Sequence, residues 1–436
     1  MLATDMSQVR DQLNQIKYEC ENEVALFTAG NLKNCIGFWQ NICDDPSVLE
    51  IINGLTIPLN QTVYQGKIPK EISFSSSEQE KIESEIHTMV KQKVIEPVSN
   101  QPVDGEFISN IFMRPKKDGG VRVILNLKEF NEFVEKKHFK MKSLQTAIDL
   151  MSKDAYLASV DFKSAYFSVS VKKSDRKYLR LFFKGKKYQF GCLPNGLTTG
   201  PRDFTKVVKS LFKYLREKGY LNTFYLDDSF LVDQDFLGCF RNVVDTIQTS
   251  RKAGFCVHPV KSVLIPTKTL VYLGFLLSTI DMTVRLTKEK VQSITHIVEN
   301  VLAKSLLTIQ ELAELVGKLV ATFPAVPLGK LYYRQLDIEK GLALKRAKGN
   351  YSEKLELSKQ AKSDLSWWLE NLPNSFTKIE SKNPDIEIRT DASTYSYGGC
   401  FHDKSISGQW HKEEQTLHIN LKEMLAVYYT LTKLCH

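Results

Sequence analysis

The chain has 436 residues, too many for a single hydrophobic core, so we expect two to four domains. Lys and Arg number 59 against 50 Asp and Glu, and the resulting net charge of +9 is modest. No apolar stretch is long enough to span a membrane, and residues 1–6 lack the basic and apolar regions of a secretory signal. The eight cysteines include no C-x-x-C pair, which argues against structural zinc. Unpaired cysteines favour a reducing compartment, cytoplasmic or nuclear.

Residues 1–66 are rich in helix signals and predict a helical N-terminal extension. Within it, Asp45-Pro46 begins a short helix that Gly54 ends. Ser75 and Glu78 have the spacing of a capping box, which predicts a helix from Gln79 to about Val94.

Two further local patterns follow along the chain. Asp118-Gly119-Gly120 lies between two β-rich segments and predicts a hairpin turn. Residues 172–187 hold eight basic residues and one acidic residue, with three aromatic residues among them and Tyr188 directly after. Basic and aromatic residues in such proximity indicate a nucleic-acid track, although lysines that protect a solvated hairpin edge would give the same pattern.

Two acidic motifs stand out in the middle of the chain. The apolar run 157–160 ends at Asp161, and Asp227-Asp228 lies between two short β-type runs, which predicts a hairpin with adjacent carboxylates at its turn. Adjacent carboxylates repel each other, and a bound divalent cation usually offsets this repulsion. Mg²⁺ prefers one or two protein carboxylates together with substrate phosphates as ligands. Asp is also a common turn residue, so the pair alone fits an ordinary hairpin as well.

Three segments in this order, 157–167, 193–204 and 225–228, resemble the motifs of reverse transcriptases. The resemblance implies an α+β right-hand polymerase, with fingers and palm over 67–282, a helical thumb over 283–345 and a connection over 346–384. It also implies an RNA-directed DNA polymerase that adds deoxynucleotides to a DNA primer on an RNA template. The cofactor implied is a pair of Mg²⁺ or Mn²⁺ ions.

By the same resemblance, Asp161, Asp227 and Asp228 would hold both metal ions, with the Phe162 carbonyl as a further ligand. Tyr166 would be the aromatic residue under the sugar that leaves no room for a 2′-hydroxyl; its ordinary alternative is a core tyrosine.

The remaining implied contacts are with the incoming nucleotide. Asn195-Gly196 would lie beside its ribose, although the family more often has Gln or Phe before the Gly. Lys116 and Arg122 would contact its phosphates, and Lys261 would donate a proton to the departing pyrophosphate. Arg122 is the better phosphate candidate because its planar group donates two parallel hydrogen bonds. A solvated surface cation is the alternative for each lysine.

The helical pattern from Thr287 onward, with a capping box at Thr308 and Glu311, predicts a two-helix thumb. Segments 315–319 and 329–334 resemble those of DIRS-like retrotransposon polymerases, which are related to the gypsy elements.

Residues 385–436 resemble the start of a ribonuclease H fold. Asp391 ends an expected strand, and Glu423 lies at the start of an expected helix. The resemblance makes them the first two of four metal-binding carboxylates, so we expect a truncated and inactive ribonuclease H-like domain. We also expect the apolar residues of that last helix to be partly exposed.

Two other functions stay open. The chain could be a non-catalytic, nucleic-acid-binding relic of a mobile element, or an RNA-templated RNA polymerase, which Tyr166 argues against. The sequence leaves the oligomeric state undetermined.

Overall fold

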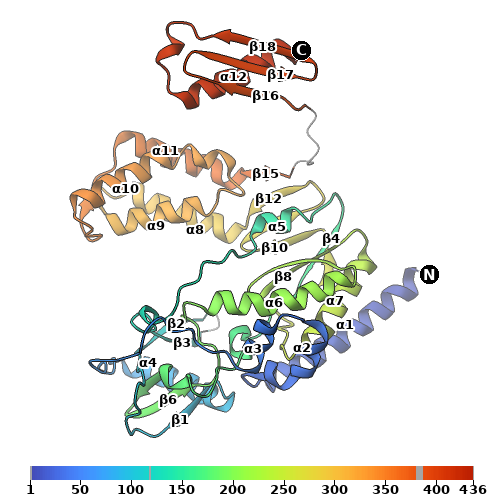
Figure 1. Ribbon diagram of the computed structural model, residues 1–436, viewed down its shortest axis with the longest axis vertical. Coiled ribbons are helices and arrows are strands. Elements are labelled where there is room, and N and C mark those ends of the chain that lie inside the picture. The colour runs from blue at the N-terminus through green and yellow to red at the C-terminus, as the bar shows by residue number, and fades with distance from the viewer. Residues whose placement is uncertain (1, 117–118, 380–385, 436) are drawn as a thin grey trace. The chain divides into compact units, whose positions relative to one another are not determined.

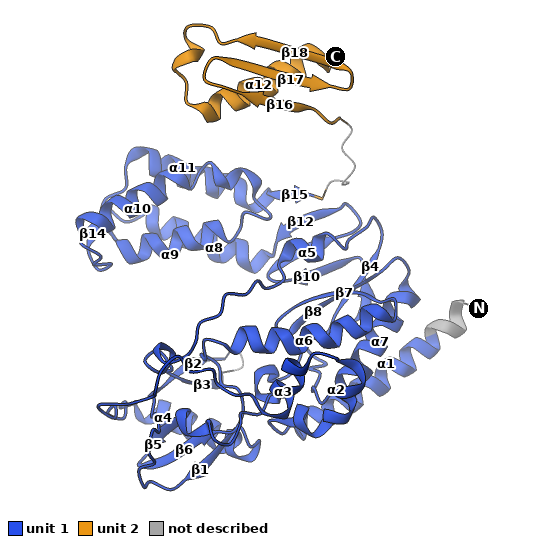
Figure 2. Ribbon diagram, viewed as in Figure 1, with its two compact units in different colours: residues 1–378 blue, residues 379–436 orange. Residues whose placement is uncertain are grey.

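A computed structural model of the chain describes residues 2–116, 119–379 and 386–435. The chain divides into two compact units, residues 1–378 and 379–436 (Figure 2). The expected turn residue Asp118 and the expected domain boundary at Asn383-Pro384 lie outside the described residues. No helix in the described part of the chain combines the length and the apolar character needed to cross a bilayer.

The N-terminal segment is helical, as predicted (Figure 1). Asp45 caps the third α-helix by accepting a hydrogen bond from the Ser47 backbone N–H at 2.9 Å, and Pro46 occupies the first turn, where its missing N–H is harmless. The elements are α1 (Leu2–Ala25), the 3₁₀ helix η1 (Asn31–Cys35), α2 (Ile36–Ile42) and α3 (Pro46–Gly54).

The centre of unit 1 is a four-stranded antiparallel sheet in the order β7-β8-β4-β9. Its strands are β7 (Leu221–Tyr225), β8 (Asp228–Asp233), β4 (Tyr156–Ser159) and β9 (Val263–Thr267), and its helices are α6 (Gly200–Glu217) and α7 (Phe236–Lys252). Helix α6 buries Phe204, Val207, Val208, Leu211 and Leu215, a spacing that places these side chains on one face. The predicted antiparallel sheet backed by helices is confirmed.

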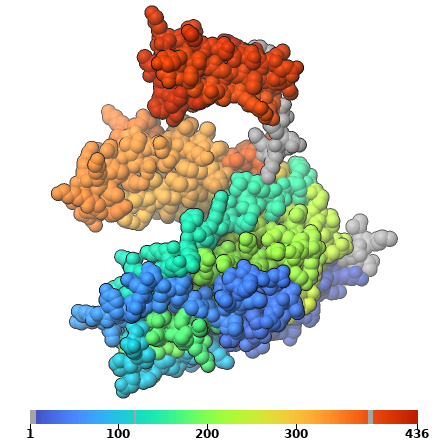
Figure 3. All heavy atoms as spheres, in the orientation of Figure 1, coloured from blue at the N-terminus to red at the C-terminus, as the bar shows by residue number. Residues whose placement is uncertain are grey.

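In the space-filling view, the blue atoms of the N-terminal segment lie directly against the green atoms of this central region (Figure 3). The contacts include buried apolar side chains of both segments, among them Trp39 and Phe255. The N-terminal segment is therefore part of the same hydrophobic core as the central sheet.

Two smaller sheets and a helix precede the central sheet. The Ser75–Glu78 capping box is present, and the helix that it opens ends at Lys91 rather than Val94. The hairpin predicted around Gly119-Gly120 is also present. The elements are α4 (Ser76–Lys91), the sheet β1-β6-β5 (Ile95–Val98, Lys186–Phe190, Arg180–Phe183), the hairpin β2 and β3 (Ile111–Pro115, Val121–Leu125), and the short helices η2 (Phe130–Glu132), α5 (Leu144–Ile148), η3 (Ala165–Ser168) and η4 (Arg176–Tyr178).

The basic stretch 172–187 does not form the continuous cationic track that its composition indicated. Lys187 is 2% exposed, and its Nζ lies 3.1 Å from both carboxylate oxygens of Glu106, which also pairs with Arg180. Arg176 pairs with Glu96 and Lys184 with Glu83. These acidic partners come from residues 83–106, so the sequence near the lysines gave no sign of them. Lys172, Lys173 and Lys186 stay exposed.

A second antiparallel sheet, in the order β10-β11-β12-β15, leads into a group of helices. The Thr308–Glu311 capping box is confirmed, and Thr287 caps the helix before it. The elements are β10 (Thr269–Tyr272), β11 (Phe275–Ser278), β12 (Thr283–Leu286), α8 (Lys288–Leu302), β13 (Leu307–Thr308), α9 (Ile309–Val320), η5 (Pro327–Lys330), α10 (Arg334–Arg346), β14 (Lys354–Leu355), α11 (Lys359–Asn371), η6 (Leu372–Asn374) and β15 (Phe376–Lys378).

Unit 2 has three antiparallel strands followed by a helix, the order that the sequence predicted. Its elements are β16 (Arg389–Ala392), β17 (Ser396–Phe401), β18 (Lys404–Gln409), η7 (Glu414–Thr416) and α12 (Ile419–Leu434). Its buried core is small, consisting of Tyr397, Trp410 and Ala426. On α12, Leu421 and Tyr428 are exposed as expected, whereas Leu425 and Leu434 are half-buried.

Candidate active site

The two adjacent aspartates lie at the turn of the β7–β8 hairpin. Tyr225 pairs with Asp228, so Leu226 and Asp227 form a two-residue turn. Leu226 has a φ of 53°, in the left-handed region that such turns require and that a leucine rarely adopts. Asp227 is exposed at the tip, and Asp228 is half-buried at the start of β8.

Asp161 follows β4 and meets this turn across the sheet. It forms an isolated antiparallel bridge with Asp228, and the Phe162 N–H donates to the Asp227 carbonyl at 3.2 Å. Residues more than sixty positions apart in the sequence are therefore neighbours at one end of the central sheet. The structure brings together the three aspartates that the sequence singled out.

The electrostatics of this group favour a bound cation. Burial raises the pKa of Asp161 to about 7, and the carboxylates of Asp227 and Asp228 add to this, although nearby Lys261 opposes it. Burial and then Asp227 also raise the pKa of Asp228. Like charges in a partly desolvated site favour the neutral form, and a cation removes that penalty.

The donor set fits a divalent metal ion. Oδ1 of Asp161 is buried and has no hydrogen-bond partner, which is an unusual state for a carboxylate oxygen. Among the described residues, no group of three or more His, Cys, Asp or Glu side chains is arranged to hold a metal ion by itself. An open set of few carboxylates suits Mg²⁺, which keeps water and substrate oxygens among its ligands.

Two serines hold the backbone around Asp161, and the sequence analysis missed both. The Ser229 hydroxyl accepts from the Val160 N–H and donates to the Val160 carbonyl, each at 2.8 Å. The Ser262 hydroxyl accepts from the Asp161 N–H at 3.0 Å. Ser229 directly follows Asp228, a position that could have drawn notice, whereas nothing in the sequence marks Ser262.

Tyr166 lies on η3, half-buried, with its ring 5.0 Å from that of Phe204. Burial raises its pKa, and Asp227 contributes, so the phenol stays protonated close to the aspartates. The nearest Tyr166 ring carbon is 3.4 Å from where a Cβ at Gly200 would stand, so the ring lies beside the start of α6. A ring held in this way is suited to act as a steric boundary.

The loop with Asn195 and Gly196 is fixed by Asn131. The Asn131 amide donates to the Gly196 carbonyl at 2.9 Å, and its oxygen accepts from the Thr198 N–H at 2.9 Å. Gly196 has a φ of 100° and is exposed, while Asn195 is half-buried. The contact that the resemblance assigned to this loop stays a prediction.

The basic candidates differ in their surroundings. Lys116 is paired with Glu85 at 2.9 Å, so a phosphate contact would have to compete with that carboxylate. Arg122 is exposed on β3 directly opposite Arg114, and no ion pair of either arginine is found among the described residues. Two opposed cations repel each other, and an anion placed between them relieves this. Lys261 is exposed and lies close enough to Asp161 to lower its pKa.

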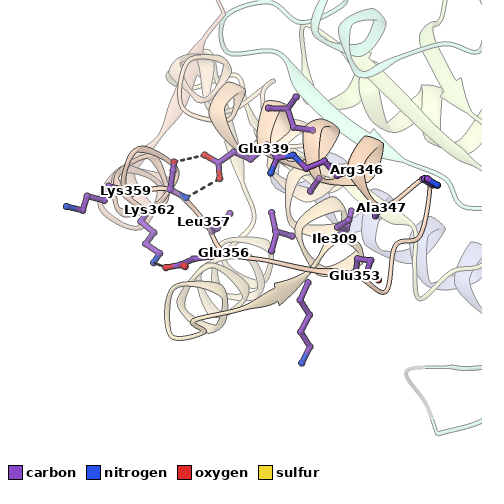
Figure 4. Close-up of a pocket in the computed structure, with 15 residues that line it drawn as sticks. Ile309, Glu339, Arg346, Ala347, Glu353, Glu356, Leu357, Lys359 and Lys362 are labelled. Atoms are coloured by element: carbon purple, nitrogen blue, oxygen red, sulfur yellow. Dashed lines mark hydrogen bonds and ion pairs between the residues drawn. The ribbon is translucent and has the colours of Figure 1, made fainter.

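A cavity of about 990 Å³ lies away from these residues, between α9, α10 and α11 (Figure 4). Its lining residues come from 309–362 and include none of the predicted site residues. Glu339 accepts hydrogen bonds from the backbone N–H and the hydroxyl of Ser358 at its wall. We assign no role to this cavity.

In unit 2, Asp391 is exposed on β16 and Glu423 is half-buried on α12. Their assignment to a ribonuclease H site stays a prediction.

The chain was compared with protein families and with solved structures, and both comparisons point to reverse transcriptases. Residues 114–277 match the family model of reverse transcriptase (RNA-dependent DNA polymerase). A foamy viral protease-reverse transcriptase solved with double-stranded DNA has a TM-score of 0.63 at 18% identity, covering 86% of this chain and 64% of that one. The same type of protein solved with an RNA/DNA hybrid has a TM-score of 0.62 at 17% identity, covering 86% of this chain and 49% of that one. The fold is therefore that of an α+β right-hand polymerase.

Two curated relatives are similar to this chain beyond the region that the family model matches. The Retrovirus-related Pol polyprotein from transposon gypsy of Drosophila melanogaster is 23% identical over 86% of this chain and 36% of its own length. The Enzymatic polyprotein of Figwort mosaic virus (strain DxS) is 23% identical over 84% of this chain and 53% of its own length. The chain thus spans roughly a third to a half of these relatives. Residues 114–277 thus resemble a reverse transcriptase domain, and most of the chain is similar to part of retrovirus-related Pol polyproteins.

Proposed function

We propose that the chain is an RNA-directed DNA polymerase of a retrotransposon, which extends a DNA primer with deoxynucleotides on an RNA template. The observation that carries this proposal is the convergence of Asp161, Asp227 and Asp228 at one end of the central sheet, with a buried, unpartnered oxygen on Asp161. Three neighbouring carboxylates destabilise the protein when no metal ion is bound. The same carboxylates are suited to bind the metal ions that a polymerase needs. The reverse transcriptase match over 114–277 supports the same conclusion.

Asp161, Asp227, Asp228 and the Phe162 carbonyl would hold two Mg²⁺ or Mn²⁺ ions. When bound, such ions stabilise the attacking and leaving oxygens of an in-line displacement. Arg122, with Arg114 opposite it, is placed on an exposed hairpin and suited to bind the triphosphate. Lys116 would join it only after release from Glu85, and Lys261 would supply a proton to the pyrophosphate.

The narrower features of this proposal rest on the sequence alone. Segments 315–319 and 329–334 support a DIRS-like element. The ribonuclease H-like unit contributes Asp391 and Glu423, and two carboxylates are too few to position both ions of a two-metal nuclease, so we propose that this unit alone is inactive.

Primer extension tests the proposal directly. Purified protein should extend oligo(dT) on poly(rA) when Mg²⁺ or Mn²⁺ is present, and chelation with EDTA should stop the reaction. Binding to the RNA/DNA duplex without any extension would favour the alternative function, a non-catalytic nucleic-acid-binding relic.

Replacing Tyr166 by Val should weaken discrimination against ribonucleotides, because removal of the ring opens the space that a 2′-hydroxyl needs. Selectivity, measured as the ratio of kcat/KM for dTTP to that for UTP, should fall by roughly 10- to 100-fold, the range over which steric pockets discriminate. Tyr166→Phe is the matched control and should keep the selectivity, since it preserves the ring. An unchanged ratio in the Val variant would show that Tyr166 is only a core residue.

A further inference from the structure

The N-terminal segment contacts the turn after α7, at Ala253 and Gly254, which leads to the residues beside Asp161. Trp39 is fully buried, and its Nε1 donates a hydrogen bond to the Ala253 carbonyl at 2.8 Å. Asn31 donates to the neighbouring Gly254 carbonyl at 3.1 Å. At Gly254, whose φ is 91°, an added Cβ would lie 2.9 Å from the Asn31 oxygen. The two backbones are therefore pressed together, and only glycine fits at this point.

The segment after Gly254 is in turn bonded to the candidate active site. Val257 forms an antiparallel bridge with Phe162, and the Lys163 N–H donates to the Cys256 carbonyl at 2.8 Å. The His258 N–H donates to the Asp161 carbonyl at 2.8 Å. The backbone from the Asp161 carbonyl to the Lys163 N–H is thus held by residues 256–258.

Aromatic side chains also link the N-terminal segment to Phe162. Phe162 and Phe255 are stacked face to face, with ring centroids 4.5 Å apart and an interplanar angle of 5°. Trp39 makes a T-shaped contact with Phe255, with ring centroids 6.2 Å apart and an interplanar angle of 74°. All three rings are at most 2% exposed. Closely packed rings have few alternative positions, so a change in one shifts its neighbour.

The N-terminal segment makes further contacts with the central region, at Arg251 and at Phe167. Arg251 pairs with Glu19 and Glu23 of α1, at 2.5 and 2.6 Å. The Gly30 N–H donates to the Phe167 carbonyl at 2.7 Å, five residues after Phe162. The N-terminal segment therefore contacts both the segment that begins at Arg251 and the chain just after the Asp161–Phe162 pair.

We propose that Trp39 and Phe255 are positioning residues, which set the Asp161 carboxylate and the Phe162 carbonyl for metal binding from outside the polymerase motifs. This inference rests on the function proposed above. Neither residue contacts substrate, and their effect passes through Phe162. A displacement of about 1 Å at a reacting group can lower a rate by about 100-fold, so the packing of these rings is expected to matter for the chemistry.

The test compares Trp39→Phe and Phe255→Leu with the control Phe38→Leu in the full chain. Phe38 adjoins Trp39 on α2, but its ring contacts Tyr214 of α6 at 6.4 Å. The control therefore loosens the same N-terminal packing without touching Phe255. Three quantities are measured: kcat and KM for poly(rA)/oligo(dT) extension, the Kd of Mn²⁺ by calorimetry in the absence of nucleic acid, and the Tm.

We expect Phe255→Leu to lower kcat by roughly 10- to 100-fold and Trp39→Phe to lower it less, with the KM for template–primer unchanged. Mn²⁺ binding should weaken several-fold in both variants, and Phe38→Leu should keep the original kcat and Kd even if its Tm falls. The inference is overturned if the protein binds no Mn²⁺, if both positioning variants keep kcat and Kd, or if Phe38→Leu loses them equally. If the unsubstituted protein extends no primer while Mn²⁺ binding follows the expected pattern, the polymerase proposal fails and the positioning role stands.

Discussion

Replacing Asp227 by Asn is expected to abolish primer extension while leaving nucleic-acid binding intact. Asn has nearly the same volume and also suits a tight turn, so the hairpin should persist. The variant loses a negative charge at the exposed tip, where the proposed metal ions would be bound. Since metal ions contribute several kcal/mol to such transition states, kcat should fall by about 10³-fold or more. Nucleic-acid binding is expected to rest on Lys and Arg side chains, which the variant leaves unchanged, so the affinity and its salt dependence should persist.

The measurements for Asp227→Asn are single-nucleotide extension and fluorescence anisotropy with an RNA/DNA duplex at several salt concentrations. Asp233→Asn is the matched control, because Asp233 lies at the opposite end of β8 and accepts a hydrogen bond from the Asp235 N–H. Extension at the original rate by Asp227→Asn would refute the assignment of the site.

Replacing Asp161 by Asn is expected to remove activity and at the same time to stabilise the metal-free protein at alkaline pH. The pKa of Asp161 is raised from 3.8 to about 7 in the folded protein. Well below pH 3.8 both the folded and the unfolded state carry the proton, so the carboxyl makes no difference. As the pH rises to 7 the unfolded state ionises more readily, and the free energy of unfolding falls; above pH 7 the full penalty remains.

Asn carries no such penalty. In EDTA at pH 8 the variant should therefore melt above the unsubstituted protein, and at about pH 3 or below the two should melt together. The site is half-exposed, so solvent screening reduces the effect to about one or two kcal/mol, and a protein of this size shifts its Tm by about 2–4 °C per kcal/mol. Mg²⁺ should reverse the order at pH 8, because only the unsubstituted protein binds it. Equal melting temperatures in EDTA at pH 8 would contradict the proposed repulsion among the aspartates.

Features that depend on neighbours in the sequence were predictable. Both capping boxes, at Ser75–Glu78 and Thr308–Glu311, and the hairpin at Asp227-Asp228 follow from residues a few positions apart. The convergence of Asp161 with this hairpin was expected only through the resemblance to reverse transcriptases. Local spacing alone does not bring β4 beside β8.

Features that depend on distant partners were not predictable. Lys187 belonged to an apparent nucleic-acid track, yet it is buried against Glu106, because an ion pair needs a carboxylate that the local sequence does not contain. The support of Asp161 by Ser262 and of Phe255 by Trp39 likewise joins segments about 100 and more than 200 positions apart. Such contacts are decided by how the whole chain packs.

The hydrogen bond from Trp39 to Ala253 spans 214 positions, which has a consequence for synthesis on the ribosome. At about 5–20 residues per second, the N-terminal helices emerge roughly 10–40 s before their partner segment exists. During that time, Leu32, Trp39 and Ile52 lack the surface that later buries them. Nascent chains should therefore bind chaperones through this region until residue 260 or so has left the exit tunnel.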